Sequence, residues 1–137
     1  MIAITKTYKD FNDVERTETK HFNLTETEIM EMELGTYGGV VEFLQRIVAA
    51  KDQPTIIKFF KEFILKAYGE KTPDGSRFDK SEELSKNFSN TQFYNLLFME
   101  LATDDEKAAQ FVNGVIPQSV GIKNEKNVQA DIVPVAN

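Results

Sequence analysis

The stretch from Val40 to Gly69 carries apolar side chains every three or four positions and is interrupted by polar residues and a proline at Asp52-Gln53-Pro54. This period places the apolar residues of each half on one side of a helix. The first set is Val40, Val41, Phe43, Leu44, Ile47 and Val48, and the second is Ile56, Ile57, Phe59, Phe60, Phe63, Ile64, Ala67 and Tyr68. Burying one such Leu, Ile or Phe contributes roughly 1.5 to 3 kcal/mol. We therefore predict a central helical hairpin that forms the largest part of the core.

The N-terminal residues follow a different pattern, typical of a β-hairpin. Ile2 and Ile4 alternate with smaller or polar residues, and a second stretch is rich in threonine and charge. Between them lies Asp10-Phe11-Asn12-Asp13, a sequence suited to a turn. We predict strands at Ile2–Lys9 and Val14–Asn23. Because an isolated two-stranded hairpin is only marginally stable, it must pack on the helices or pair with another chain.

Four further helices are indicated by caps and apolar periodicity. Two capping boxes, Thr25–Glu28 and Thr103–Glu106, each mark a helix start; the first helix should end at Gly35 and the second at Asn113-Gly114. The other two helices are expected at Ser81–Phe88 and Thr91–Ala102.

The connections are also visible in the sequence. Gly35, Gly38 and Gly39 predict a flexible link into the helical hairpin, and Gly69 is a natural C-cap. The residues that follow, 70–81, contain Pro73-Asp74-Gly75 and are expected to form a surface loop.

These predictions describe an α+β fold that is mainly α, with an N-terminal β-hairpin and about five helices packed around the central helical hairpin. Its 137 residues suffice for one domain without disulfides or a metal. We expect a single globular domain over residues 1–117. Residues 118–137 contain no aromatic side chain and little periodicity, so a flexible tail is expected there.

Composition narrows the possible functions. The chain has no Cys, which excludes disulfides and thiolate chemistry. Its net charge of −6 opposes unspecific binding to nucleic acid, which depends on Lys and Arg. No apolar run is long enough to span a membrane, and no signal sequence is evident. We expect no nucleic-acid or membrane partner and a cytoplasmic location.

Residues suited to catalysis are few. The single histidine, His21, lies in a polar strand and is interpreted as exposed. Glu100, between Met99 and Leu101, is the acid in the most apolar setting, yet we place it on the solvent side of its helix. The acidic face of the helix after Thr25 is interpreted as solvated, because cation sites need acids that converge from several elements or a loop. We predict no enzymatic activity, no cofactor and no metal site.

The most distinctive sequence lies in the second half of the chain. YGEK at residues 68–71 is followed by a P-D-G-x-R-F turn at 73–78, then by FMELATD at 98–104 and FVNGVIP at 111–117. This order, together with YKDFNDVERTETKHFNLTETE at residues 8–28, resembles the tail assembly chaperones of long-tailed bacteriophages. The resemblance covers most of residues 1–117.

The resemblance implies a mainly helical protein in the host bacterial cytoplasm. Such a protein binds the tape measure protein, keeps it soluble and helps to recruit tail tube protein, and the family often has a longer form made by ribosomal frameshifting. Self-association is a further possibility. The alternative is a structural virion protein of head, neck or tail, held in place by contacts with neighbouring subunits.

Two features bear on a partner surface. Residues 40–71 carry six basic and four acidic side chains, whereas the segments on either side are acidic. The basic residues are either a solvated face or a site for an acidic partner helix. A chaperone for a long helical client also needs an apolar groove bordered by charge. Four residues exceed the expected core stripes and are candidates for such a surface, with burial between helices as the alternative: Leu65, Phe93, Leu96 and Leu97.

Overall fold

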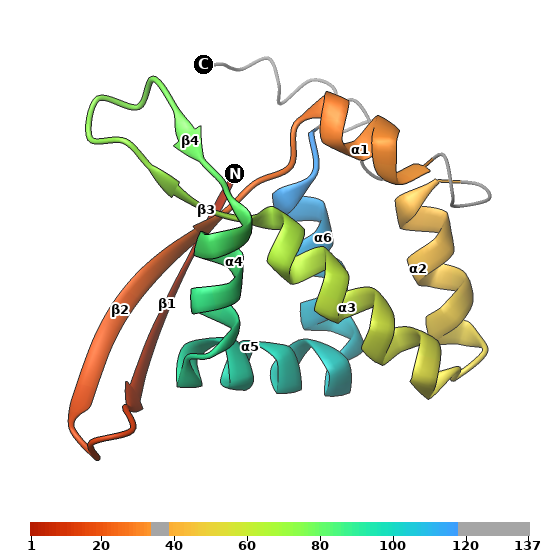
Figure 1. Cartoon of the computed structure of the whole chain (residues 1–137). Coiled ribbons are helices and arrows are strands. Elements are labelled where there is room, and N and C mark those ends of the chain that lie inside the picture. Colours follow the sequence, from red (N-terminus) through yellow and green to blue (C-terminus); the bar gives the residue numbers. More distant parts are fainter. Residues whose placement is uncertain (34–38, 118–137) are drawn as a thin grey trace.

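A computed structural model describes residues 1–33 and 39–117 of the chain. Figure 1 shows a β-sheet at one side of a group of helices. The strands are β1 (Ile2–Lys9), β2 (Glu15–Phe22), β3 (Tyr68–Lys71) and β4 (Phe78–Asp79). The helices are α1 (Glu26–Glu33), α2 (Val40–Ala49), α3 (Gln53–Ala67), α4 (Glu82–Ser89), α5 (Gln92–Thr103) and α6 (Asp105–Val115). The α+β, mainly α prediction is confirmed. The predicted tail over residues 118–137, the predicted helix end at Gly35 and the link residue Gly38 lie outside the described residues.

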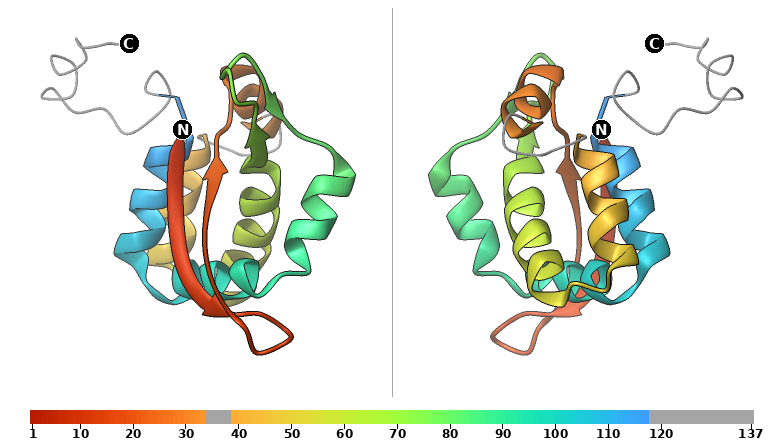
Figure 2. Two further views of the ribbon diagram at one scale, coloured as in Figure 1. Left: turned by 90° about the vertical axis from the view of Figure 1, so that its left-hand side faces the viewer. Right: turned by 90° about the vertical axis from the view of Figure 1, so that its right-hand side faces the viewer.

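The N-terminal hairpin has the predicted strands. β1 and β2 pair antiparallel over their full length, from Ile2 opposite Phe22 to Lys9 opposite Glu15. Side chains of β1 alternate between half-buried and exposed, as the period of a strand requires. The outer face is threonine-rich, and the Thr5 and Thr19 hydroxyls are 2.7 Å apart. Both views in Figure 2 show the hairpin lying against the helices and its turn extending past α5.

The inner face of this hairpin packs on the helices. The ring of Tyr8 meets the ring of Phe93 edge-on, with 6.0 Å between centroids. The Lys6 ammonium lies 2.8 Å from a Glu100 carboxylate oxygen on α5. Ile2 and Ile4 pack against the core as well. These contacts within the chain supply the stability that an isolated hairpin lacks.

The predicted loop after α3 is wrong in part, because it contains strands β3 and β4. They extend the sheet in the order β1-β2-β3-β4, and Gly69 lies opposite His21 of β2. Gly69 is therefore not the C-cap of α3; Tyr68 is. A Cβ at Gly69 would lie 2.6 Å from a ring carbon of Phe78, so only glycine fits this close approach. Strands of four and two residues are too short to show an alternating pattern.

Helix α3 is the central element of the core, as the sequence indicates. It buries Phe60, Phe63 and Ile64 completely, and it lies among α2, α4 and α5 in Figure 1. Next to α3, aromatic rings surround Phe22 at centroid distances of 5.8 Å for Phe88 and 5.4 Å for Phe111. The predicted apolar arc is too wide at one position, because Ile57 is 46% exposed.

Two predicted boundaries near the end of the fold need correction. The N-cap of α6 is Asp104, whose carboxylate accepts hydrogen bonds from the backbone N–H groups of Glu106 and Lys107. Thr103 belongs to α5 instead, so the second capping box is not formed. α6 also continues through Gly114 to Val115. A Cβ at Gly114 would lie 2.8 Å from Cδ1 of Ile2, so a larger residue there would require the Ile2 side chain to move.

The first capping box is formed and has an additional role. Thr25 N–H donates to Glu28 Oε1 at 2.9 Å, and Glu28 N–H donates to Thr25 Oγ1 at 3.2 Å. The same Glu28 carboxylate accepts hydrogen bonds from Lys80 Nζ, which also donates to the backbone oxygens of Asn23 and Lys66. Partial burial disfavours the charged carboxylate, but these hydrogen bonds lower the pKa of Glu28 below its usual value. Lys80 thus links α1, α3 and the end of β4.

Candidate partner-binding groove

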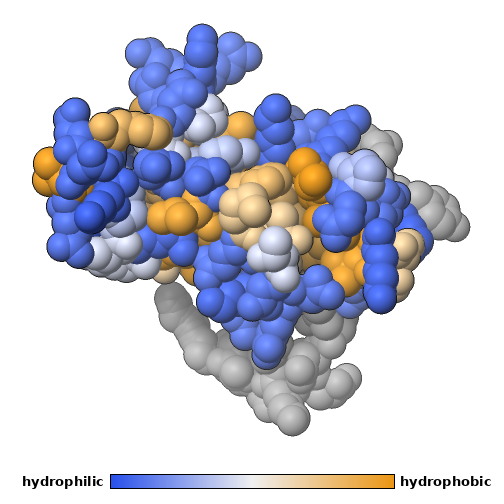
Figure 3. Space-filling view, turned by 90° about the horizontal axis from the view of Figure 1, so that it is seen from below, coloured by the Kyte–Doolittle hydropathy of each residue, from blue (hydrophilic) through white to orange (hydrophobic). Residues whose placement is uncertain are grey.

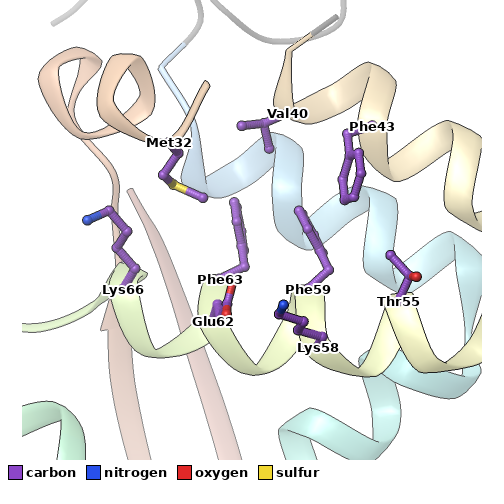
Figure 4. A pocket seen from close by; sticks show the side chains of 9 residues that line it. All are labelled: Met32, Val40, Phe43, Thr55, Lys58, Phe59, Glu62, Phe63 and Lys66. Carbon is purple, nitrogen blue, oxygen red and sulfur yellow. The ribbon is translucent and has the colours of Figure 1, made fainter. Parts of the chain in front are cut away.

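An apolar groove of about 440 Å³ lies between α1, α2 and α3. Figure 4 shows side chains of α2 and α3 pointing toward one another across it, with α1 at one end. The groove is lined by Met32, Val40, Phe43, Thr55, Lys58, Phe59, Glu62, Phe63 and Lys66. All but Met32 come from the helical hairpin that the sequence predicts.

Aromatic rings form the inner part of the groove. The Phe59 ring stacks on Phe63 at a centroid distance of 5.3 Å and lies 5.8 Å from Phe43. Phe63 and Val40 have almost no contact with solvent, so they support the groove from beneath. Phe43, Phe59 and Met32 are half-buried. These three side chains are the apolar surface that a partner could contact.

Charged residues border the groove along α3. Lys58, Glu62 and Lys66 follow one another at intervals of four residues and are exposed, which places them along one side of the helix. The ion pairs among the described residues involve other side chains. On α2, the Arg46 guanidinium lies 5.6 Å from the ring centroid of Phe43. The border is predominantly positive and Glu62 is its acidic member.

The turn between α2 and α3 sets these helices side by side. Lys51 has a positive φ of 55°, and the Asp52 side chain caps α3 by accepting from the Thr55 N–H. Pro54 occupies the first turn of α3, where its missing N–H costs nothing. Thr55, which takes part in this cap, lies at one end of the groove in Figure 4.

The residues proposed from sequence as a partner surface lie elsewhere. Phe93 and Leu97 lie on the side of α5 that faces the core, and both are buried. Leu65 is half-buried beside α4, and its carbonyl accepts a hydrogen bond from the Ser85 hydroxyl at 3.0 Å. Leu96 is 42% exposed. The structure thus does not bring the four together, and none of them lines the groove.

A second apolar area occurs on the outer side of α5. Leu96 and Met99, which is 51% exposed, are three residues apart and share one side of this helix. Figure 3 shows the face that includes α5, with apolar side chains across its middle and hydrophilic side chains around them. Both of these exposed apolar residues come from a single helix, α5.

Comparison with known proteins identifies the family. Residues 1–134 match a family described as phage tail assembly chaperone. The chain belongs to this family. A search of curated proteins and a search of solved structures found no match. Nearly the whole chaperone chain is therefore covered by the family match, in agreement with the resemblance of its sequence motifs.

The family indicates a non-enzymatic role. The structure also places the two side chains that were considered for catalysis. His21 lies in β2, opposite Ala3 and Gly69, and is half-buried rather than exposed as predicted. Hydrogen bonds from Lys107 and Lys6 lower the pKa of Glu100, whereas a general acid at neutral pH requires a raised pKa.

No group of three or more acids or histidines within residues 1–33 and 39–117 is arranged to hold a metal ion. None of the helices described in the chaperone is both long enough and apolar enough to cross a membrane.

The sequence alone assigns Phe43 and Phe59, the two half-buried rings of the groove, to the core of the chaperone. Phe43 and Phe59 fall on the predicted apolar arcs, and periodicity cannot tell a half-buried position at the edge of an arc from a fully buried one. The distribution of charged residues in the sequence did contain a signal for the groove. The basic excess of residues 40–71 includes Arg46, Lys58 and Lys66, which lie beside the groove or along its border.

Proposed function

We propose that this tail assembly chaperone binds the tape measure protein in the host cytoplasm and keeps it soluble while the tail is built. The observation that supports the proposal is the groove between α2 and α3, where Phe43 and Phe59 remain half-buried behind a charged border. Proteins that bind amphipathic helices use such apolar grooves. A long helical client would place apolar side chains against the two rings.

The test is co-expression of the full chain with the tape measure protein of the same phage. Phe43→Gln removes apolar surface from the groove and should sharply lower the soluble fraction of the client. Ile57→Gln is the matched control, because Ile57 is an exposed apolar residue of the adjacent helix that does not line the groove. Circular dichroism of both variants checks that they fold. A folded Phe43→Gln chain that solubilises the client as well as wild type does would contradict the proposal.

The outer side of α5, which includes Leu96, is proposed as an additional contact area for the client. Leu65, which lies beside α4, is a second candidate contact. Leu96→Glu and Leu65→Glu each place a charge at one of these two positions. Normal folding with reduced client solubility would support a contact at the substituted residue. Loss of folding would assign that residue to the core, and unchanged client solubility in both variants would restrict binding to the groove.

The alternative function, a structural virion protein, is favoured by one feature. The turn of the β1–β2 hairpin extends beyond α5 in Figure 2, and its Phe11 is 74% exposed. A subunit in a particle could be held by such an extension. Mass spectrometry of purified particles distinguishes the two functions, because an assembly chaperone is absent from the finished tail. The same co-expression with tail tube protein tests whether this chain also recruits that protein.

A further inference from the structure

The order of charges along the border of the groove is a feature that client binding alone does not explain. Lys58, Glu62 and Lys66 alternate in sign. At 1.5 Å per residue, each step of four residues corresponds to about 6 Å along α3. All three side chains are exposed and stand beside the same apolar groove. A uniformly basic border would attract any acidic helix, but an alternating border distinguishes between positions of that helix.

We propose that the groove selects an amphipathic helix whose flank carries an acidic, a basic and an acidic side chain at steps of three or four residues, beside an apolar stripe. This inference rests on the proposed function and specifies the client segment. The acids would face Lys58 and Lys66, and the base would face Glu62. The apolar stripe would contact Phe43, Phe59 and Met32.

The charge order determines the axial position of the client helix and not its direction. Read from either end, the border is basic, acidic and basic, so a client helix could run either way along α3. Displacement by one step of four residues, however, places like charges opposite one another. Complementary charges at an exposed border mainly contribute specificity. The apolar contacts would supply most of the affinity, and the border would choose among the many helical segments of a long client.

Other basic residues allow a matched control. Lys61 is also exposed on α3, but it does not line the groove. Lys61→Glu changes the net charge of the same helix by the same amount as Lys58→Glu, Glu62→Lys and Lys66→Glu together. An effect of overall charge would therefore appear in both chains, whereas an effect of the border would appear only in the chain with the three substitutions.

The experiment measures binding of two synthetic helical peptides to the full chain by fluorescence anisotropy. The peptides share one apolar stripe and differ only in a flank of Glu-Lys-Glu or Lys-Glu-Lys at steps of four residues. Wild type should prefer the first peptide by about tenfold, the size expected from several exposed ion pairs. A chain carrying Lys58→Glu, Glu62→Lys and Lys66→Glu together should reverse the preference. Lys61→Glu should preserve it.

The outcomes separate this inference from the proposed function. Equal affinity for the two peptides, failure to bind either, or an unchanged preference in the charge-reversed chain overturns the inference. If Phe43→Gln still abolishes client solubility in those cases, the proposed function stands. If sedimentation shows a dimer that Phe43→Gln dissociates, the groove is occupied by a second copy of this chain, and the inference is overturned as well.

Discussion

Phenylalanine rings are used differently in two regions of this chaperone. Around Phe22, the rings of Phe88 and Phe111 are enclosed by the sheet and by α3, α4, α5 and α6, and all three are buried. In the groove, Phe43 and Phe59 are in contact with each other but remain half-buried. The residue type is the same in both places, and only the covering elements differ.

The comparison shows how a small fold can separate stability from binding. The enclosed rings lose almost all contact with water, which stabilises the folded state by about 25 cal/mol for each Å² of apolar surface buried. Among residues 1–33 and 39–117, no element covers the exposed edges of Phe43 and Phe59. Their remaining apolar surface is available to a partner, and the charges on α3 lie beside it. Variants in the two regions should therefore affect different properties.

The largest effect on stability is expected in the enclosed region. Phe60→Ala removes a completely buried ring of α3 and should lower the free energy of unfolding by about 3 to 5 kcal/mol, because it leaves a cavity. Phe43→Ala in the groove should cost only about 1 kcal/mol. Chemical denaturation of both variants measures the difference. Equal losses would show that Phe43 is as much a part of the core as Phe60.

A smaller effect on stability is expected for a substitution in β3, the strand that pairs with β2 beside the enclosed rings. Gly69→Ala places a Cβ 2.6 Å from the Phe78 ring and 2.9 Å from the Asp79 backbone oxygen. Relieving these contacts should cost about 1 to 3 kcal/mol. Gly75→Ala is not a suitable control, because Gly75 has a positive φ of 78°; Ser76→Ala, in the same turn, is preferable. A thermal melt of Gly69→Ala that matches wild type would show that β3 and β4 can separate without loss of stability.

A modest, pH-dependent effect is expected where the hairpin meets α5. Hydrogen bonds from Lys107 and Lys6 lower the pKa of Glu100 below its ordinary value of 4.5. A carboxyl whose pKa is lower in the folded state stabilises the fold above the unfolded pKa and loses this contribution as pH falls through the folded value. Stability should therefore decline as pH drops below about 4.5.

The variant Glu100→Gln should remove part of that decline and lower stability at pH 7 by about 1 kcal/mol or less. Denaturation midpoints between pH 7 and pH 3 measure both effects. Glu82→Gln, at an exposed position of α4, is the matched control. An identical pH profile for wild type and Glu100→Gln would show that this contact does not contribute to stability.

The smallest effect is expected for the predicted tail. Residues 118–137 have no aromatic side chain and little apolar periodicity, so burial there could offset little conformational entropy. Truncation after Pro117 should leave the melting temperature and client solubility close to wild type. A large drop in melting temperature would show that these residues take part in the folded domain.

The sequence alone determined the local elements with strong periodicity or caps. The strand Ile2–Lys9 and the capping box at Thr25 were correctly predicted, because each depends on residues close together in the chain. A break between two helices was also predicted correctly, but it lies at residues 50–52, because Gln53 and Pro54 already belong to the first turn of α3. The burial of Phe60 and Phe63 could also be predicted, because both lie on the apolar side of the second helix of the predicted hairpin. The family could also be identified, because its motifs are continuous segments of sequence.

The tertiary structure decided which apolar residues are covered. Leu97 and Leu96 are neighbours in sequence, yet the first is enclosed by the core and the second is exposed. Gly69 and Gly114 look like helix-ending residues, but their role depends on Phe78 and Ile2, which reach them from other elements. The groove likewise depends on how α1, α2 and α3 meet. Such contacts join residues far apart in the chain, so no local pattern records them.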